Sequence, residues 1–335
     1  MKCGSTNRLV SASGPNRRWI LVLGFFIFCA SLGAQSGTGY DIRWMGQFPP
    51  VEADKKGSFG EFVSKLVFGK KPGEVIKPFG IVATHPGHFL ILDQGAGAVF
   101  ECFNGEAELL RAMKKSSREF PSLVAMCKIR GGDLLFTDSR MNLVFRISGD
   151  KLSLLSGSVA FDHPTGIAYC KEKDEIWVVE TGAHRITILN RDGDLVRYIG
   201  ERGSGPGAFN YPTFIWIDGD GKVYVVDSMN FRVQVFDQEG SILHSFGESG
   251  DATGYMARPK GVATDSRGNI YVADALFHVV QIFDREGNYL YNFGGQGQGT
   301  GKFWMPAGIY NDEHDYIYVA DSYNSRIQVF QRVKN

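Results

Sequence analysis

Three of the seven histidines could take part in metal chemistry. His184 and His278 each stand four residues after an acidic residue that ends an apolar run, whereas His163 directly precedes a proline. A zinc ion in a protein needs three or four ligands. Because His163 occupies a different position of the pattern, a site built from these three histidines would need an irregular arrangement. Zinc is therefore an alternative here and not the primary expectation.

Acidic residues recur after six apolar runs, and their oxygens could hold a cation such as calcium. They are Asp93, Asp138, Glu180, Asp227, Asp274 and Asp321. In three cases an arginine follows five residues later, as Arg185, Arg232 and Arg326. A residue type that recurs in every unit is most simply explained by structure. We expect carboxylates that cap turns and form ion pairs between neighbouring units.

Three glycine-rich linkers have a composition that phosphate-binding loops also show. They begin at Gly200, Gly247 and Gly294 and read GERGSGPGAFNYP, GESGDATGYMARP and GGQGQGTGKFWMP. A phosphate loop presents its ligand to the N-terminus of a following helix. Each linker here leads into an apolar run with strand character, so we expect a crossover between sheets, with glycines at positions of positive φ.

The elements that must position all these residues are short strands. Between Tyr211 and Pro259, four runs of β-branched and aromatic residues are separated by Gly, Asp and Asn turn signals, which predicts four antiparallel strands. The runs are Phe214–Ile217, Val223–Val226, Val233–Phe236 and Ile242–Phe246. One such sheet has nothing to bury its faces against. Neighbouring copies of the same unit are needed.

Six copies of the unit begin near prolines that are spaced by 43, 43, 48, 47 and 47 residues. The prolines are Pro78, Pro121, Pro164, Pro212, Pro259 and Pro306. Four strands at a repeat length of about 40 to 50 residues predict a β-propeller. The fold class expected is therefore all-β, a six-bladed β-propeller of four-stranded antiparallel blades.

The segments Pro212–Gly240, Pro259–Gly287 and Pro306–Phe330 share the run P.GIA.D..G.IYVAD..N.RVQVFD..G and resemble the NHL repeat. The resemblance extends over roughly residues 60 to 335 and is strongest in the last four units. It implies a six-bladed propeller of the kind found in secreted bacterial NHL-repeat proteins. It implies no single activity, because propellers serve as lyases, lactonases, RNA-binding proteins and interaction platforms.

The N-terminus has the pattern of a signal peptide, with Arg8, Arg17 and Arg18 before the apolar run Trp19–Ala30 and small residues after it. We expect an exported protein that is periplasmic, at the cell surface or secreted. Lipidation at Cys29 and a retained membrane anchor stay open as alternatives. The formal net charge is zero, which gives no sign of a nucleic-acid partner.

The resulting domain prediction is a signal peptide over 1–34, an N-terminal arm over 35–58 and the propeller over 59–335. The chain ends just after the third strand of the sixth unit. Phe62–Gly69 (FVSKLVFG) matches the fourth strand of the repeat, so we expect an N-terminal strand from this segment to close the last blade. Cys102, Cys127 and Cys170 are expected to be free thiols, since equivalent points on neighbouring blades exceed the roughly 7 Å span of a disulfide.

The linkers before each proline and the turns between second and third strands should share one face, which we call the proline-side face. The units differ most there, and cationic, aromatic and histidine side chains gather on it. The candidate binding residues are His163, His184, Arg185, Tyr211, Phe231, Arg232, Arg258, His278, Tyr323 and Arg326. Such a composition suits recognition of a partner, because binding energy concentrates on these residue types.

The function expected is that of an exported, non-catalytic binding or scaffold propeller that recognises a protein, peptide or glycan without a cofactor. The alternative is a metal-dependent lyase or hydrolase in the central channel. Resemblance to amidating lyases implies zinc on the three histidines above. Resemblance to lactonase-type propellers implies calcium on the acidic residues together with Asn142, Asn230 and Asn324. The arginines and aromatic residues would suit single-stranded RNA, but the export signal and zero net charge argue against it.

Overall fold

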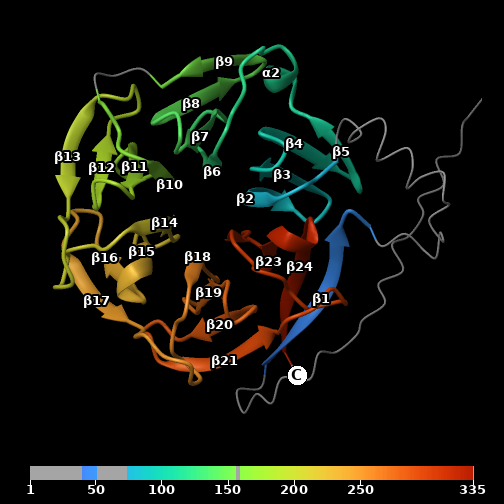
Figure 1. The fold of residues 1–335 in the computed structure, drawn as a ribbon, viewed down its shortest axis with the longest axis vertical. Coiled ribbons are helices and arrows are strands. Elements are labelled where there is room, and N and C mark those ends of the chain that lie inside the picture. The colour runs from blue at the N-terminus through green and yellow to red at the C-terminus, as the bar shows by residue number, and fades with distance from the viewer. Residues whose placement is uncertain (1–39, 51–73, 156–158, 335) are drawn as a thin grey trace, which may run out of the picture.

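The computed structural model describes residues 40–50, 74–155 and 159–334. They form six four-stranded antiparallel sheets arranged in a ring around a central axis (Figure 1). The predicted six-bladed propeller is therefore confirmed. The predicted signal peptide, most of the predicted arm and the segment Phe62–Gly69 lie outside the described residues. Within the described part of the chain, no helix has the length and apolar character to cross a membrane.

Blades 1 to 5 each contain four consecutive strands, and the first strand of each blade lines the axis. Blade 1 comprises β2 (Pro78–His85), β3 (His88–Asp93), β4 (Ala98–Phe103) and β5 (Glu106–Leu109). Blade 2 comprises β6 (Leu123–Lys128), β7 (Leu134–Asp138), β8 (Leu143–Ser148) and β9 (Lys151–Leu154). Blade 3 comprises β10 (Pro164–Cys170), β11 (Glu175–Glu180), β12 (Arg185–Leu189) and β13 (Leu195–Ile199).

Blades 4 and 5 follow the same order, whereas blade 6 takes its fourth strand from the N-terminal part of the chain. Blade 4 comprises β14 (Pro212–Ile217), β15 (Val223–Asp227), β16 (Arg232–Phe236) and β17 (Ile242–Phe246). Blade 5 comprises β18 (Pro259–Thr264), β19 (Ile270–Asp274), β20 (Val279–Phe283) and β21 (Tyr289–Gly294). Blade 6 comprises β22 (Ile309–Asn311), β23 (Tyr316–Asp321), β24 (Arg326–Lys334) and β1 (Tyr40–Phe48).

The hydrophobic core lies between blades rather than within one. Tyr224 and Val226 of blade 4, for example, pack in one buried cluster with Val262 and Ile270 of blade 5. Full burial of each such side chain contributes about 1.5–3 kcal/mol relative to exposure. This is why a single blade would not be stable and a closed ring is. Cys102, Cys127 and Cys170 are free thiols in this structure.

The last blade is closed by an N-terminal strand, but not by the segment expected. β1, from within the region that we assigned to the arm, pairs with β24 from Tyr40 opposite Lys334 to Phe48 opposite Ile327. Its Ile42 is buried toward blade 5 and its Phe48 toward blade 1. The prediction matched Phe62–Gly69 to the repeat by its ending. A bulge between Trp44 and Gly46 gives β1 an irregular alternation that this criterion could not detect.

The first two blades depart from the repeat, as their weaker sequence match suggests. In blade 2, Leu123 and not Pro121 pairs with Asp138, so the repeat starts two residues later than predicted. Cys127 therefore occupies a different position in its blade from Cys170. Blade 1 continues from β5 into the short helix α2 (Arg111–Lys114), whose Ala112 and Met113 are buried.

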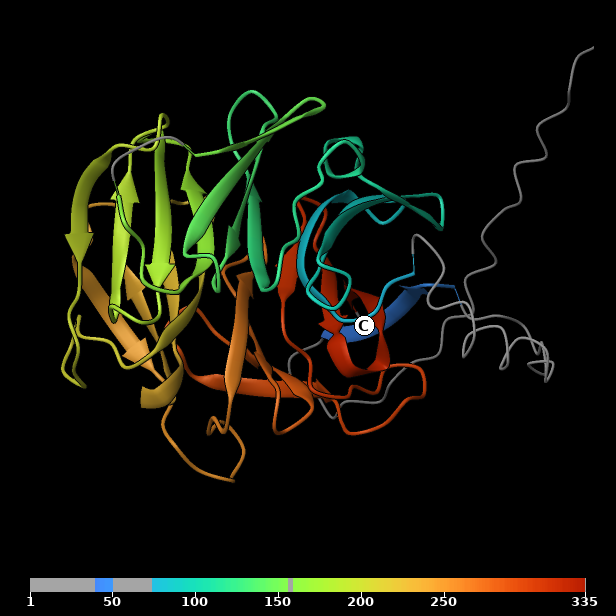
Figure 2. The same ribbon diagram turned by 45° about the horizontal axis from the view of Figure 1, so that its top comes forward.

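The strand directions define two faces. Pro212 pairs with Asp227, and Pro259 pairs with Asp274, so the start of each first strand lies beside the end of the second. The crossover linkers and the turns between second and third strands thus share the proline-side face. Figure 2 shows the ring tilted, with the strands of the yellow-green blades side by side and their connecting loops at both ends.

The glycine-rich linkers are crossovers, as predicted. Each folds back on itself through an isolated bridge, such as Arg202 with Phe209 and Gln296 with Phe303. Gly294 has φ of +113°, and a Cβ there would lie 2.5 Å from the ring of Phe303. Glycine is therefore required by both the backbone conformation and the space.

Candidate functional site

A residue in the left-handed conformation precedes the third strand in every blade. These residues are Gly97, Asn142, His184, Phe231, His278 and Ser325, with φ between 53° and 61°. We call them the left-handed column. In blades 2, 3, 5 and 6 this position turns the side chain toward the segment that leads into the next blade. Few side chains adopt this conformation without strain.

Three members of the left-handed column bind the next blade through a backbone amide. The Tyr211 N–H donates to Nδ1 of His184 at 3.1 Å, and the Met305 N–H donates to Nδ1 of His278 at 3.0 Å. In blade 2 the Oδ1 of Asn142 accepts from the His163 N–H at 2.9 Å. The two histidines that share this position therefore act as contacts between blades.

His163 is in a different setting. Its side chain is exposed, and its Nδ1 lies 2.7 Å from Oδ1 of Asp162. His184 is buried and packs against the ring of Tyr211 at a centroid distance of 4.5 Å. Among residues 40–50, 74–155 and 159–334, no group of three or more His, Cys, Asp or Glu side chains has the geometry to hold a metal ion.

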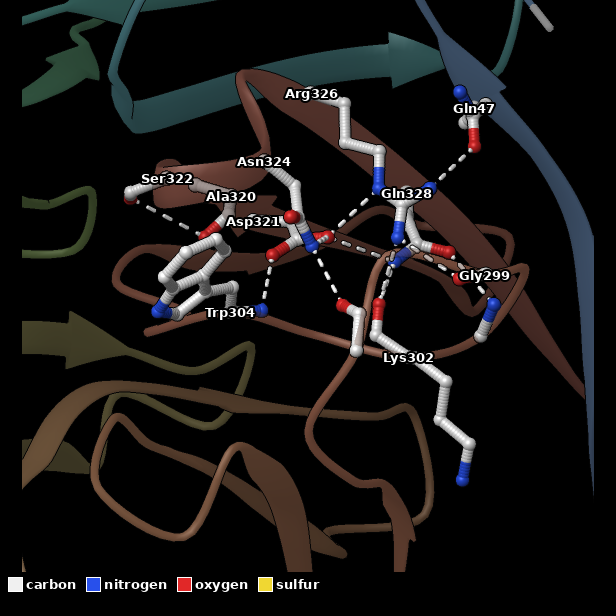
Figure 3. Close-up of polar contacts among 12 residues, drawn as sticks. Gln47, Gly299, Lys302, Trp304, Ala320, Asp321, Ser322, Asn324, Arg326 and Gln328 are labelled. Atoms are coloured by element: carbon white, nitrogen blue, oxygen red, sulfur yellow. Dashed lines mark hydrogen bonds and ion pairs between the residues drawn. The ribbon is translucent and has the colours of Figure 1, made fainter.

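The six recurring carboxylates are all fully buried. Asp321 shows how such a charge is accommodated (Figure 3). Its Oδ1 accepts from the Trp304 N–H at 2.7 Å, and its Oδ2 accepts from Arg326 Nε at 2.7 Å, from Asn324 at 2.9 Å and from Gln328 at 3.1 Å. All four of these donors belong to its own blade and linker, which identifies the carboxylate as structural.

The arginines of this pattern pair within a blade, and not between blades as predicted. Arg232 Nε donates to Asp227 at 2.9 Å, while its terminal nitrogen donates to the carbonyls of Gly205 at 2.8 Å and Ala208 at 3.0 Å. Arg326 binds the carbonyls of Gly299 and Lys302 in the same way. The side chains of Arg232 and Arg326 are only 13% and 9% exposed. Both hold the crossover linker in place.

Large apolar side chains are exposed on the proline-side face of blades 4 to 6. Five large side chains that are 42–56% exposed lie in the linkers and turns of these blades, and we call them the apolar arc: Tyr211, Met229, Leu276, Trp304 and Tyr323. Met229, Leu276 and Tyr323 stand two residues after the buried carboxylate. The same position holds Gly95, Arg140 and Gly182 in blades 1 to 3.

Cations accompany the apolar arc. The ammonium of Lys77 lies 5.5 Å from the ring centroid of Tyr323, and the exposed Arg258 directly precedes blade 5. Lys260 follows Pro259 and is partly buried. Burial and the positive charges of Arg258 and Lys77 lower the pKa of Lys260 to about 8. Sequence inspection missed Lys260, although it is the one charged residue at a position that is neutral in the other blades.

A cavity of about 680 Å³ occupies the channel toward the opposite face. First strands supply its walls, including Trp216, Tyr310 and Cys127, and acidic residues such as Asp218 and Asp312 stand at its rim. Asp218 and Asp312 accept hydrogen bonds from the tyrosines of the second strands, at 3.0 and 2.8 Å. Burial raises the pKa of Cys127 to about 12, so this thiol is protonated at neutral pH and a poor nucleophile.

Comparison with known proteins gives one family match. The model of a family described as "6-bladed beta-propeller" (DUF5128) matches residues 158–251 and 261–331. No curated protein matches the chain. The match agrees with the fold at the level of a six-bladed propeller, while the finer resemblance to NHL repeats stays a prediction.

Solved structures similar to this one are also propellers. Virginiamycin B lyase from Staphylococcus aureus superimposes with a TM-score of 0.55 and 17% identity over 77% of this chain and 96% of that one. An auxiliary nutrient binding protein from Bacteroides thetaiotaomicron gives 0.59 and 13% over 78% and 70%. A gluconolactonase from Xanthomonas campestris gives 0.60 and 13% over 78% and 88%.

At these identities the likeness concerns the fold alone, because one propeller scaffold carries both enzymes and binding proteins. The sheet order, the family match and the structural neighbours agree with one another. The chain is a six-bladed β-propeller, closed by its own N-terminal strand, whose second half matches the DUF5128 family.

Proposed function

We propose that this protein is an exported, non-catalytic binding or scaffold propeller that recognises a protein, peptide or glycan through the apolar arc of its proline-side face. The observation that carries the proposal is that five exposed large apolar side chains stand in the proline-side linkers and turns of blades 4 to 6, with the rings of Trp304 and Tyr323 6.4 Å apart. Large apolar side chains exposed together on one face mark interaction sites on soluble proteins. The Trp and Tyr members are residue types in which binding energy concentrates.

The candidate residues divide into two groups by their contacts. Arg185, Arg232, Arg326, His184 and His278 bind their own blade or the next linker, and so support the surface. Tyr211, Phe231, Arg258 and Tyr323 remain candidates for contact with a partner, joined by Met229, Leu276 and Trp304. His163 is exposed but lies in blade 3, away from the apolar arc.

The alternative, a metal-dependent lyase or hydrolase, finds no matching donor set among the described residues. His184 and His278 each use Nδ1 to accept a backbone hydrogen bond. The oxygens of Asp227 and Asp321 are occupied by their own blades. We therefore propose the binding function alone.

The test is capture of partners by cross-linking and mass spectrometry in the native compartment, with two matched variants. One carries Leu276→Ser, Trp304→Ser and Tyr323→Ser in the apolar arc. The control carries Leu195→Ser, Val196→Ser and Leu243→Ser, which are exposed to a similar degree on the outer strands of blades 3 and 4. We expect the arc variant to lose the partner and the control to keep it. Equal capture by both would place the site elsewhere.

Export is tested separately. We expect N-terminal sequencing of the native protein to begin close to residue 35 and fractionation to recover it outside the cytoplasm. A mature protein that retains Met1 and stays with the cytoplasmic fraction would contradict this part of the proposal.

A further inference from the structure

One position in the ring carries a charge only in blade 5. The residue after the first position of each blade is Phe79, Val124, Thr165, Thr213, Lys260 and Ala307, with blade 2 aligned by the pairing of Leu123 with Asp138. In blades 3 and 4 the hydroxyl group at this position bonds to a second hydroxyl, as Thr165 with Thr181 at 2.7 Å and Thr213 with Ser228 at 2.6 Å. In blade 5 the corresponding pair is Lys260 and Ala275, which cannot form such a bond.

Lys260 also has no counter-charge. The structure gives its ammonium no hydrogen bond or ion pair with any described residue, and Arg258 and Lys77 are the charges that act on it. The carboxylate of its own blade, Asp274, is occupied by the backbone N–H groups of Ala257, Arg258, Leu276 and Phe277 at 2.8–3.3 Å. Lys77, Arg258 and Lys260 thus act on one another at the edge of the apolar arc, and none of the three forms an ion pair with another residue that the structure describes.

Burying a cation next to other cations is unfavourable, and the lowered pKa of Lys260 expresses this. A bound oxyanion would supply the missing counter-charge. The same ligand would reach the apolar arc, because Lys77 lies over Tyr323 and because Leu276 belongs to the same blade as Lys260. A ligand that fits both features must combine an anionic group with apolar groups.

We propose that Lys77, Arg258 and Lys260 form the anion-binding part of the apolar arc, and that the partner is an acidic peptide segment. Its carboxylates bind the three cations while its apolar side chains pack on Met229, Leu276 and Trp304. This inference rests on the proposed function and specifies its partner. Aliphatic side chains such as Met229 and Leu276 complement apolar peptide side chains better than the hydroxyl groups of a glycan. The buried carboxylate of this blade, Asp274, already accepts backbone hydrogen bonds and is not available to a glycan.

The test is selection of a random 12-residue peptide library on the purified protein, followed by binding measurements on synthetic peptides. We expect the selected peptides to carry Asp or Glu beside apolar residues. Lys260→Thr, which introduces the residue found in blades 3 and 4, should weaken their binding about tenfold. Lys260→Arg keeps the charge and should retain most of the affinity. The control Lys222→Thr removes one lysine on the opposite face and should change nothing.

A double-mutant cycle completes the test. Replacing Asp and Glu of a selected peptide by Asn and Gln should cost the same factor, and Lys260→Thr should then have no further effect. Selected peptides without acidic residues, or acidic peptides that bind Lys260→Thr as well as the wild type, would overturn the proposal. The proposal would also be overturned if the selection enriched no peptide. Binding of polygalacturonate, an acidic glycan, in a Lys260-dependent manner would then identify a glycan as the partner.

The variant with Leu276→Ser, Trp304→Ser and Tyr323→Ser separates this proposal from the one that it rests on. Selected peptides that bind this variant as tightly as the wild type would show that the apolar arc is not the docking surface, which contradicts the proposed function. Peptides that no longer bind the arc variant but bind Lys260→Thr as tightly as the wild type would contradict only the proposal that the partner is acidic.

Discussion

Blades 1 to 3 and blades 4 to 6 share a buried carboxylate at the end of the second strand and a left-handed residue four positions later. They differ at the position two residues after the carboxylate. Blades 1 to 3 have Gly95, Arg140 and Gly182 there, and blades 4 to 6 have Met229, Leu276 and Tyr323. The comparison teaches that the repeated residues fix the turn, which leaves the intervening position free to vary. Function is therefore expected in the side chains that the repeat does not need.

A second contrast concerns how the carboxylate is held. In blades 4 and 6 it binds Asn, Arg and Gln side chains as well as a backbone amide. In blades 1 and 5 it binds backbone amides. The charge is equally buried in both cases, so the two arrangements are two solutions to the same problem.

The largest expected effect tests the contrast between a carboxylate that binds side chains and one that binds backbone amides. Asp321→Ala should destabilise the protein by about 3–5 kcal/mol, because it leaves Arg326 buried without its counter-charge. Asp274→Ala removes bonds to backbone amides alone and should cost about 1–3 kcal/mol. Urea denaturation measures both. Equal losses would mean that the side-chain network adds nothing to the backbone contacts.

The next effect compares members of the left-handed column. Asn142 and His278 both accept a backbone amide of the next blade, so His278→Asn should change the free energy of unfolding by less than about 0.5 kcal/mol. His278→Val loses the acceptor and places a β-branched residue at φ of +57°, which should cost about 2 kcal/mol. Thermal unfolding of the two variants tests this. A destabilised Asn variant would show that the column is not interchangeable between blades.

A smaller effect sharpens the contrast between Lys260 and its neutral counterparts. The folded-state pKa of Lys260 is lowered to about 8 from 10.5, so the folded protein binds fewer protons than the unfolded chain between these values. The free-energy cost of burying the charged Lys260 is fully present below pH 8, and it decreases as the pH rises and the folded protein loses this proton. The stability of the wild type relative to Lys260→Thr should therefore increase on the order of 1 kcal/mol between pH 7.5 and 10. Arg258 and Lys77 are the charged groups that act on Lys260. A constant difference would contradict the burial of an unpaired cation.

The smallest effect concerns the apolar arc itself. Leu276→Gln and Met229→Gln replace exposed side chains and should change the free energy of unfolding by less than about 0.5 kcal/mol. The same substitutions should weaken partner binding. Stability is checked by urea denaturation alongside the binding assay. A large loss of stability would show that the apolar arc belongs to the core and not to a docking surface.

The sequence predicted the six blades and the strands of the repeat, because period, turn residues and alternation are local signals. β14 to β17 lie within one or two residues of the four predicted runs. The structural role of the carboxylates was also predicted, since recurrence points to architecture. Closure of the last blade by an N-terminal strand was predicted correctly, but the segment chosen for it was wrong. Partner strands almost 300 residues apart share no local signal, and β1 carries a bulge.

The candidate site was predicted less completely. The residue pattern placed Tyr211, Arg258 and Tyr323 on one face. It could not distinguish an exposed arginine from Arg326, whose side chain is buried in an ion pair within its own blade. Met229, Leu276 and Trp304 were not among the predicted site residues, because an apolar residue in a repeat is normally interpreted as part of the hydrophobic core. Aligning the blades and asking which position changes from charged or small to large apolar would have found them.

The pairing of β1 with β24 has a consequence for biosynthesis. The ribosome makes the segment Tyr40–Phe48 before blades 1 to 5, yet its partner strand β24 follows all of these blades in the sequence. Ile42 and Phe48 therefore stay unburied while five blades are translated, and β1 and β24 must then meet at a considerable entropic cost of loop closure. A nascent chain from which β24 has not yet emerged leaves the edge of β1 unpaired, so the synthesis of β24 is the step that allows the ring to close.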